Sequence, residues 1–248
     1  MEKKYLILSD IHGNLSAFDA VQKDCCGEVF DGVFLLGDCI DYGMRSNEVI
    51  EKLQQLENSL WSGKLLIHLW GNHERLMVDG DWERLSSDRG RAMAKYTARH
   101  LTASSLDYIK NKMNPKGCAR CGLEDFSIFA VHGSKEDVYW KAIMPDDVHG
   151  DYSDCDIVFS GHSHYPHCFT KFYAVEDEEY RNKKAVIFIN PGSVGQPRNQ
   201  NPCAQYAVLH LPSKRTELRA AAYDVAYEQS LFPDEIDAFY RTRLKKGI

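Results

Sequence analysis

Five short motifs along this chain combine aspartate, asparagine and histidine in a way that suits metal binding. They are Asp10-Ile11-His12, Gly37-Asp38, Gly71-Asn72-His73-Glu74, Val131-His132-Gly133 and Gly161-His162-Ser163-His164. Carboxylate, carboxamide oxygen and imidazole are hard or borderline ligands that together suit divalent cations acting on phosphate. Because the set is large enough for two ions, a metal-dependent enzyme is the leading interpretation.

Each motif is preceded by an apolar run that is typical of a β-strand. These runs read YLILS, GVFLLG, LLIHLW, FSIFAV and DIVFS. A side chain just past the carboxyl end of a strand points into the crevice where open α/β sheets bind ligands. We therefore expect the five motifs to converge on one rim of the fold.

The first half of the chain alternates predicted strands with predicted helices. Strands are expected over 4–9, 32–36 and 64–70, with helices over 14–25 and 46–57 between them. This order implies a parallel sheet with right-handed crossovers. A long segment with few helix breakers follows, so we predict two or more helices within 74–113, packed beside or over the motif rim.

The second half is rich in strand-like runs and ends in a predicted amphipathic helix. Strands are expected over 126–131, 156–160, 168–174, 184–190, 204–210 and 215–223, and the helix over 233–245. The charged run 176–184 is typical of an exposed turn. The order fits an α/β fold, a four-layer αββα sandwich of two mixed sheets flanked by helices. No linker is evident, so residues 1–248 are predicted to form a single domain.

The composition limits which binding partners and which cellular compartment we expect for this protein. The formal net charge is −6 without any basic block, so binding to nucleic acid through phosphate neutralisation is not expected. The first apolar run is too short for a signal peptide, and no run approaches the ~20 residues of a membrane span. We expect a cytoplasmic protein without membrane contact. The eight cysteines then predict free thiols, and Cys118 and Cys121 are expected at a hairpin tip.

The five motifs, in this order, resemble the calcineurin-like metallophosphoesterase superfamily. The resemblance covers residues 5 to about 198 and is strongest with the small single-domain prokaryotic phosphodiesterase-like branch. The family fold is the same αββα sandwich. The resemblance implies that Asp10, His12 and His164 hold one metal, that Asn72, His132 and His162 hold the other, and that Asp38 bridges the two. It also implies that His73 binds no metal but assists phosphate binding or protonates the leaving group.

Further residues near these motifs are candidates for supporting roles. Asp41 is expected to orient His73 as a hydrogen-bonded carboxylate. The run Asn190-Pro191-Gly192-Ser193-Val194-Gly195-Gln196-Pro197-Arg198 resembles a loop that borders the active site in the small prokaryotic branch. Arg198 is therefore a candidate phosphate-binding residue, because a planar guanidinium suits phosphate.

The chain also departs from one branch of the superfamily. Protein Ser/Thr phosphatases carry arginines where this sequence has Tyr42 and Trp70, so phosphoprotein phosphatase activity is not expected. Arg45 is a candidate replacement for one of these missing arginines.

The resemblance and the residues together predict a hydrolase of small-molecule phosphoesters. The expected reaction is hydrolysis of phosphomonoesters or phosphodiesters by a metal-bridging hydroxide. Two transition-metal ions such as Mn, Fe or Zn are expected, because four imidazoles suit Mg²⁺ poorly. The substrate is expected to be a small phosphoester, nucleotide-derived compounds included. Two alternatives stay open, a non-catalytic metal-binding scaffold of the same fold and a two-metal nuclease. The sequence leaves open the monoester or diester preference and the oligomeric state.

Overall fold

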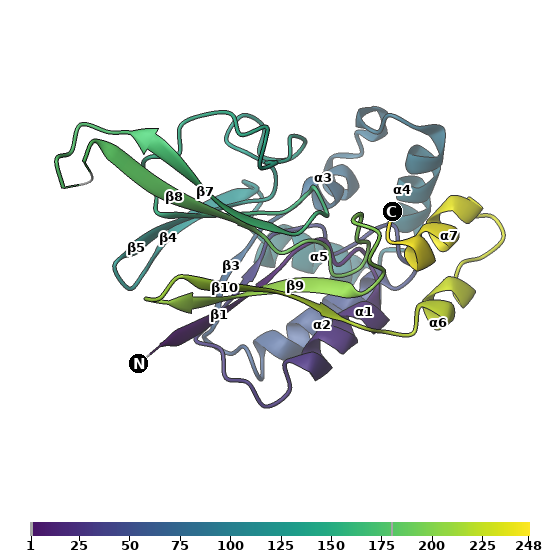
Figure 1. The fold of residues 1–248 in the computed structure, drawn as a ribbon. Coiled ribbons are helices and arrows are strands. Elements are labelled where there is room, and N and C mark those ends of the chain that lie inside the picture. The colour runs from purple at the N-terminus through teal and green to yellow at the C-terminus, as the bar shows by residue number, and fades with distance from the viewer. Residues whose placement is uncertain (1, 180) are drawn as a thin grey trace.

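Two five-stranded mixed sheets lie face to face in the computed structural model, which describes residues 2–179 and 181–248 (Figure 1). The first sheet has the strand order β10-β9-β1-β2-β3. Its strands are β1 (Lys3–Leu8), β2 (Gly32–Leu35), β3 (Leu65–His68), β9 (Ala204–Leu211) and β10 (Arg215–Ala221). The parallel run β1, β2, β3 is connected by α1 (Leu15–Asp24) and α2 (Ser46–Glu57), as the sequence predicts.

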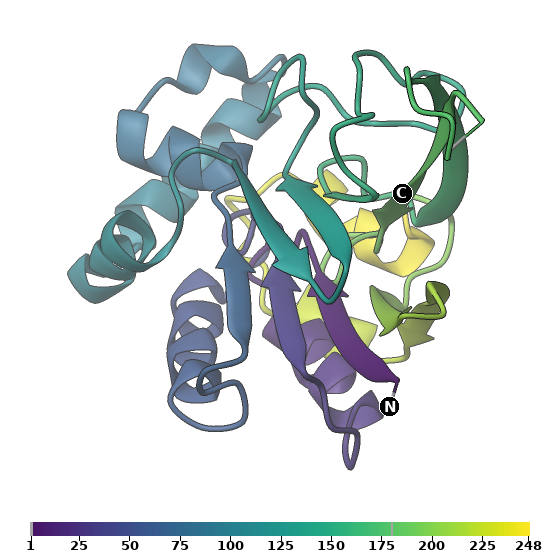
Figure 2. The same ribbon diagram turned by 90° about the vertical axis from the view of Figure 1, so that its left-hand side faces the viewer.

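The second sheet is built from the next five strands of the chain. They are β4 (Cys118–Leu123), β5 (Phe126–Val131), β6 (Ile157–Ser160), β7 (His167–Ala174) and β8 (Lys183–Asn190), in the order β4-β5-β6-β8-β7. Strands β5, β6 and β8 are parallel, and the two edge strands run antiparallel to them. Figure 2 shows the teal strands of this sheet above the purple and blue strands of the first.

The alternation of side-chain direction along β1 explains how this strand packs against both the second sheet and the helices. Tyr5 and Ile7 pack against residues of the second sheet such as Phe159, whereas Leu6 and Leu8 belong to the cluster formed with the helices. Successive strand side chains point to opposite faces, so a run that is apolar on both faces must be covered on both. The YLIL run is buried on both faces for this reason.

Three helices between the third and fourth strands extend the helical layer of the first sheet. They are α3 (Asn72–Asp79), α4 (Asp88–His100) and α5 (Ala103–Lys112), with a short 3₁₀ turn at Trp82–Arg84. Residues from all three join the apolar cluster that contains α1 and α2. The outer face of the second sheet is covered by the irregular segment 132–156, from which Ile143 and Tyr152 pack against it.

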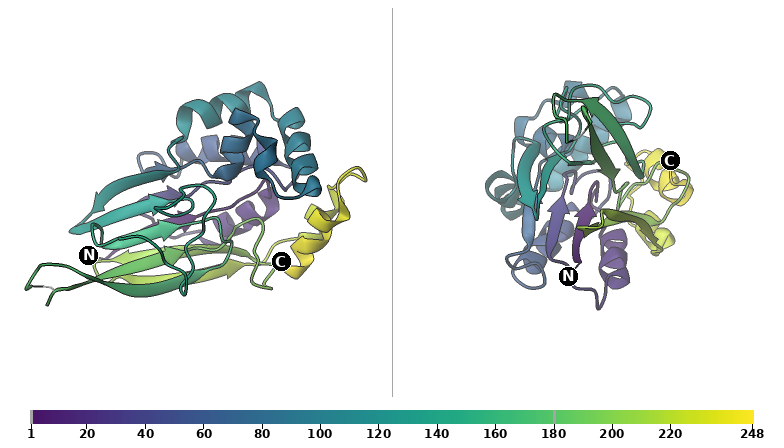
Figure 3. Two further views of the ribbon diagram at one scale, coloured as in Figure 1. Left: turned by 90° about the horizontal axis from the view of Figure 1, so that it is seen from above. Right: turned by 60° about the vertical axis from the view of Figure 1, so that its left-hand side comes forward.

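The chain ends in two short helices beside α4. These are α6 (Val225–Ser230), which the sequence analysis does not anticipate, and α7 (Ala238–Lys246). Met93 of α4 packs with Tyr240 and Leu244 of α7. Figure 3 (left) shows both helices at the end of the molecule opposite the N-terminus. The last helix begins later than the predicted residue 233, because Asp237 accepts from the main-chain N–H of Phe239 at 2.8 Å and starts the helix there.

The predicted architecture of two packed mixed sheets with helices is confirmed, with local corrections. Cys118 and Cys121 lie within edge strand β4 and not at a hairpin tip, because the turn is formed by residues 124–125. All eight cysteines are free. Residues 176–179 and 181–183 of the predicted 176–184 turn are exposed, whereas Lys184 is half-buried in β8; Tyr180 lies outside the described residues. No described helix combines the length and apolar character needed to cross a bilayer.

Candidate metal centre

The five motifs occupy the carboxyl ends of neighbouring strands in both sheets. Asp10 and His12 follow β1, Asp38 follows β2, His132 follows β5, and the two histidines of the last motif follow β6. Asn72 begins α3 just after β3. Five of these residues have a left-handed backbone, and so do Asp41 and Tyr42 nearby; the values include φ of 55° at Asp10 and 53° at Asp38. Such strain in non-glycine residues is typical of functional sites.

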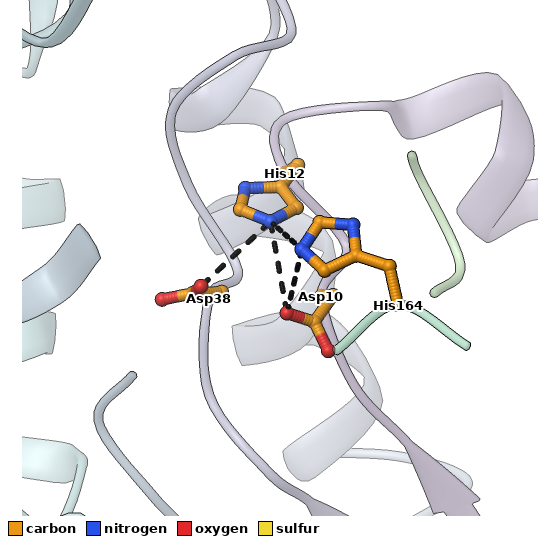
Figure 4. Close-up of side chains that lie close together, drawn as sticks. All are labelled: Asp10, His12, Asp38 and His164. Atoms are coloured by element: carbon orange, nitrogen blue, oxygen red, sulfur yellow. Dashed lines mark hydrogen bonds and ion pairs between the residues drawn. The ribbon is translucent and has the colours of Figure 1, made fainter. Parts of the chain in front are cut away.

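The first group of side chains consists of Asp10, His12, His164 and Asp38 (Figure 4). The Nε2 atoms of His12 and His164 are 3.2 Å apart. Asp10 Oδ1 lies 3.2 Å from His164 Nε2 and 3.7 Å from His12 Nε2. The atoms point at one another from both sheets, which leaves a common centre for a bound cation.

The second group consists of Asn72, His132, His162 and again Asp38. Asn72 Oδ1 is 3.0 Å from His132 Nε2 and 2.9 Å from His162 Nδ1. Asp38, His132 and His162 also satisfy the geometry of a shared cation site. The two groups therefore have Asp38 in common.

Asp38 reaches both groups with the same oxygen atom. Its Oδ2 lies 3.7 Å from His12 Nε2 and 3.3 Å from His132 Nε2. Its Oδ1 is engaged separately, by the main-chain N–H of His73 at 2.8 Å. Within the described residues, Asp38 Oδ2 and Asp10 Oδ1 are buried without a hydrogen bond. A buried carboxylate oxygen without a donor is costly, so both atoms suit a cation.

The orientation of the imidazole rings supports the same conclusion. The Nδ1 atoms of His12, His132 and His164 face the carbonyl oxygens of Ile40, Leu36 and Gln196 at 3.2, 2.8 and 2.6 Å. An Nδ1–H that donates to a carbonyl leaves a lone pair on Nε2 in the neutral ring. The 3.2 Å contact between the Nε2 atoms of His12 and His164, whose pKa values are lowered chiefly by burial, would then join two lone pairs, which repel. A divalent cation between them would turn this contact into a ligand pair, so the residues present fit a metal centre.

The pKa values of the site fit this picture. Burial lowers the pKa of His162 to about 4, and burial with the nearby charge of Arg198 lowers that of His164 to about 3, so both rings are neutral and able to bind metal. Burial works to raise the pKa of Asp38, but the surrounding histidines hold it below its usual range. Asp38 is therefore an anion at neutral pH.

His73 lies beside the cluster and has a different set of partners. Its Nδ1 is 2.6 Å from Asp41 Oδ2, and Asp41 Oδ1 accepts from Thr97 Oγ1 at 2.6 Å. Burial opposes the charged form of His73, but Tyr42, Asp38 and Asp41 raise its pKa to about 10. The ring thus carries a proton at neutral pH and can donate it. The orienting role of Asp41 and the catalytic role of both residues stay predictions, which this contact supports.

Two arginines were predicted to bind substrate, and they differ in location. The main-chain N–H of Arg198 donates to the carbonyl of His164 at 3.3 Å, so Arg198 adjoins the cluster. The Arg45 guanidinium instead contacts Glu228 and the hydroxyl of Ser16, 2.7 Å away, and it stacks on Tyr227. Arg45 is thus engaged by the α6 region, and its substrate role stays a prediction that this geometry does not favour.

Three contributors to the site were not assigned a role from the sequence. Glu74 accepts from the N–H groups of Asp38, Cys39 and Gly71 at 2.7–2.8 Å and so fixes the loop after β2. Glu74 belongs to the Gly-Asn-His-Glu motif, so the sequence contained a signal that could have assigned it a role in the site. Tyr42 lies 4.4 Å from the His73 ring, and Thr97 supports Asp41 from α4. Neither had a local signal, because their contacts depend on tertiary packing.

Comparison with known proteins agrees with this geometry. The family model for the calcineurin-like phosphoesterase superfamily domain matches residues 4–214. An uncharacterized protein of Methanocaldococcus jannaschii is 28% identical over 240 residues, covering 90% of each chain. The crystal structure of a metallophosphoesterase from Sphaerobacter thermophilus is 27% identical with a TM-score of 0.70 over 100% of both chains. A hypothetical protein from Pyrococcus horikoshii, 18% identical, has a TM-score of 0.80 over 99% of this chain and 98% of its own.

The chain therefore belongs to the calcineurin-like phosphoesterase superfamily. Its buried Asp/His cluster is suited to divalent metals, as expected for a metallophosphoesterase.

Proposed function

We propose that this protein is a dinuclear-metal phosphoesterase that hydrolyses phosphomonoesters or phosphodiesters of small molecules. The observation that carries the proposal is the position of Asp38 Oδ2, which lies 3.7 Å from His12 Nε2 of one group and 3.3 Å from His132 Nε2 of the other. One carboxylate oxygen within reach of two ligand groups is the arrangement that a shared bridging ligand requires. The seven predicted ligands would divide accordingly into two sites.

The charge of the site suits a phosphate substrate. Two divalent cations bring about +4, and Asp10 and Asp38 return about −2, since Asn72 and neutral histidines carry no charge. Bound there, the metals would supply Lewis-acid charge and lower the pKa of water. The remaining positive charge attracts the phosphate oxygens, and the burial of the cluster strengthens that attraction.

The residues of the chain would then supply binding and proton transfer. Protonated His73 is held by Asp41 through Nδ1, which leaves its Nε2 proton for the leaving oxygen. Arg198, whose main-chain N–H donates to the carbonyl of His164, would bind a phosphate oxygen. Glu74 holds the loop that carries Asp38, so the cluster is organised before substrate binds.

A paired chromogenic assay tests the proposal. The metal-loaded protein is incubated with bis(p-nitrophenyl) phosphate and with p-nitrophenyl phosphate in the presence of Mn²⁺. Hydrolysis of either substrate that is abolished by chelation and by Asp38→Asn would support the proposal. The ratio of the two rates measures the diester or monoester preference.

The alternatives give different outcomes in the same experiment. Stoichiometric metal binding without any turnover would favour a scaffold, and cleavage of nucleic acid that far exceeds cleavage of both chromogenic substrates would favour a nuclease. Metal analysis of the active protein would test whether the ions are Mn, Fe or Zn. A small and nucleotide-derived substrate and a cytoplasmic location are the other sequence expectations that stay predictions.

A further inference from the structure

Asn190, the last residue of β8, has a fully buried amide whose oxygen and nitrogen both have partners. Its Oδ1 accepts from the main-chain N–H of Gly192 at 2.9 Å. Its Nδ2 donates to the carbonyl of Gly161 at 2.9 Å and to the hydroxyl of Ser163 at 3.1 Å, with a longer contact of 3.4 Å to the hydroxyl of Ser160. The N–H must face the amide oxygen and the carbonyl must face the nitrogen, so these contacts allow one orientation of the side chain.

The partners of this amide belong to the turn that carries two predicted metal ligands. His162 and His164 flank Ser163, and both have a left-handed backbone, with φ of 62° and 56°. His162 Nδ1 is 2.9 Å from Asn72 Oδ1 in the second group, whereas His164 Nε2 is 3.2 Å from Asp10 Oδ1 in the first. One turn therefore contributes a side chain to each half of the candidate metal centre.

The conformation of this turn depends on contacts from outside it. A left-handed backbone is unfavourable for residues that have a Cβ, and it persists where the surrounding structure fixes it. Within the turn, the N–H of Ser163 donates to the Gly161 carbonyl at 2.7 Å, and the Asn190 amide is a second donor to the same oxygen. Because β8 pairs with β6 in the second sheet, the amide is itself held in place. It connects the turn after β6 to the end of β8.

Ser193, three residues further along the chain, makes a comparable contact to the other side of the centre. Its hydroxyl donates to the carbonyl of Asp10 at 2.7 Å and accepts from the N–H of Gln196 at 2.8 Å. The carbonyl of Gln196 in turn accepts from the His164 ring. Asp10 and His164 both belong to the first group, so the described contacts of Ser193 lead to that group.

We propose that Asn190 is a positioning residue that sets both halves of the metal centre through the turn 161–164. Its hydrogen bond to Gly161 holds the left-handed turn, and this turn presents His162 and His164 to different cation sites. Loss of the bond should therefore weaken both metal sites together, whereas loss of the Ser193 hydroxyl should weaken the first alone. The use of two cations rests on the proposed function, but metal affinity can be measured without turnover.

Calorimetric titration of the metal-free full chain with Mn²⁺ tests the proposal. Asn190→Asp keeps the size of the side chain and an acceptor for Gly192, but it places a carboxylate oxygen against the Gly161 carbonyl. The affinity for both Mn²⁺ ions should fall by roughly ten- to a hundredfold, the usual effect of changing a residue that supports metal ligands. Ser193→Ala should lower the affinity for one ion and leave the other near its wild-type value. Electron paramagnetic resonance distinguishes paired from single Mn²⁺ ions and so shows which sites each variant fills.

Asn47→Asp is the matched control for a purely structural effect. The Asn47 amide donates to the carbonyl of His100 at 2.9 Å and accepts from the N–H of Thr102 at 2.9 Å, so it makes the same two kinds of contact between α2 and the turn after α4. None of the seven predicted ligands lies in these two segments. Urea unfolding without metal should show that both Asn→Asp variants are destabilised, but Asn47→Asp should bind Mn²⁺ with wild-type affinity.

A milder pair of variants covers the case in which Asn190→Asp does not fold. Ser163→Ala removes one acceptor of the amide at a half-buried position and should lower the affinity for both ions to a smaller extent, whereas Ser163→Thr keeps the hydroxyl and should retain the wild-type affinity.

Wild-type affinity for both ions in Asn190→Asp, or in Ser163→Ala where the first variant does not fold, would overturn the proposal. An equal loss of affinity in Asn47→Asp would overturn it as well, because the effect would then be one of general stability. These results differ from failure of the proposed function, in which the protein binds metal but hydrolyses no phosphoester.

Discussion

His73 and Asp38 are close in the cluster, yet their partners assign them different tasks. Asp38 directs an unpaired oxygen toward both ligand groups, whereas His73 is bound to Asp41 and has no carboxylate of the cluster as an Nε2 partner. His73→Gln should therefore retain metal and lower turnover by ~10²–10⁴, the usual size of a general-acid contribution. Asp38→Asn should lose metal together with activity. Metal analysis and steady-state kinetics on both variants check this, and full activity of His73→Gln on a poor leaving group would exclude the acid role.

The histidines of the site also predict how the metal-free protein responds to pH. The pKa values of His73 and His132 are raised to about 10 and about 9, against opposing burial, by Tyr42 and by the carboxylates of the site. A group whose pKa is raised in the folded state stabilises that state fully at pH values below its unfolded pKa of ~6.5. This stabilisation is lost as the pH rises through the folded pKa. The free energy of unfolding of the metal-free protein should fall between pH 7 and 9. The slope is on the order of 1 kcal/mol per pH unit for each histidine.

Urea unfolding at pH 7 and pH 9 measures this slope directly. His73→Gln should flatten it, because that variant removes one of the two raised groups. An unchanged slope in the variant would show that the charge of His73 is not linked to folding.

At the scale of elements, the loop after β8 is held against the loop after β1 at very close range. A Cβ atom on Gly195 would lie 1.8 Å from the carbonyl oxygen of Ile11, and the next residue, Gln196, supplies the carbonyl that orients His164. Gly195→Ala should therefore displace the loop, weaken metal binding and destabilise the fold by roughly 1–3 kcal/mol.

Gly122→Ala is the matched control for this change. It lies in edge strand β4, where an added Cβ would meet nothing within 4 Å. Thermal unfolding and metal titration of both variants would compare them. If the two substitutions behaved alike, close approach of the β8 loop would not be what positions His164.

At the scale of the whole molecule, the candidate metal centre joins the two sheets. Asp10, His12 and Asp38 extend from the first sheet, and His132, His162 and His164 extend from the second. Metals bound there would crosslink the layers in the folded state alone, and binding to the folded state raises its stability by mass action. Mn²⁺ at 100 times its Kd should add about 2.7 kcal/mol.

Differential scanning calorimetry with Mn²⁺ and with a chelator measures this effect. The Tm should rise with Mn²⁺ concentration and return to the metal-free value on chelation. Asp38→Asn should show little rise. A Tm in the wild type that is independent of metal would mean that the cluster is organised by the protein alone.

The sequence by itself determined the layer order and the predicted ligands. Each ligand follows an apolar strand-like run, and the carboxyl ends of parallel strands meet at one rim, so local pattern was enough to predict convergence. The αββα assignment followed from the same alternation. The edge strand Cys118–Leu123 and helix α6 were missed, because short polar segments take their structure from neighbours more than from their own pattern.

Only the tertiary structure decided which side chains support or extend the centre. Arg45 contacts Glu228 across 183 residues of sequence, and Thr97 reaches Asp41 across 56. Tyr240 stacks on Tyr42 beside the cluster, and it comes from a helix that nothing in the sequence connected with the site. Such pairings depend on how elements that are distant in the sequence pack against each other. A local pattern of residues does not contain that information.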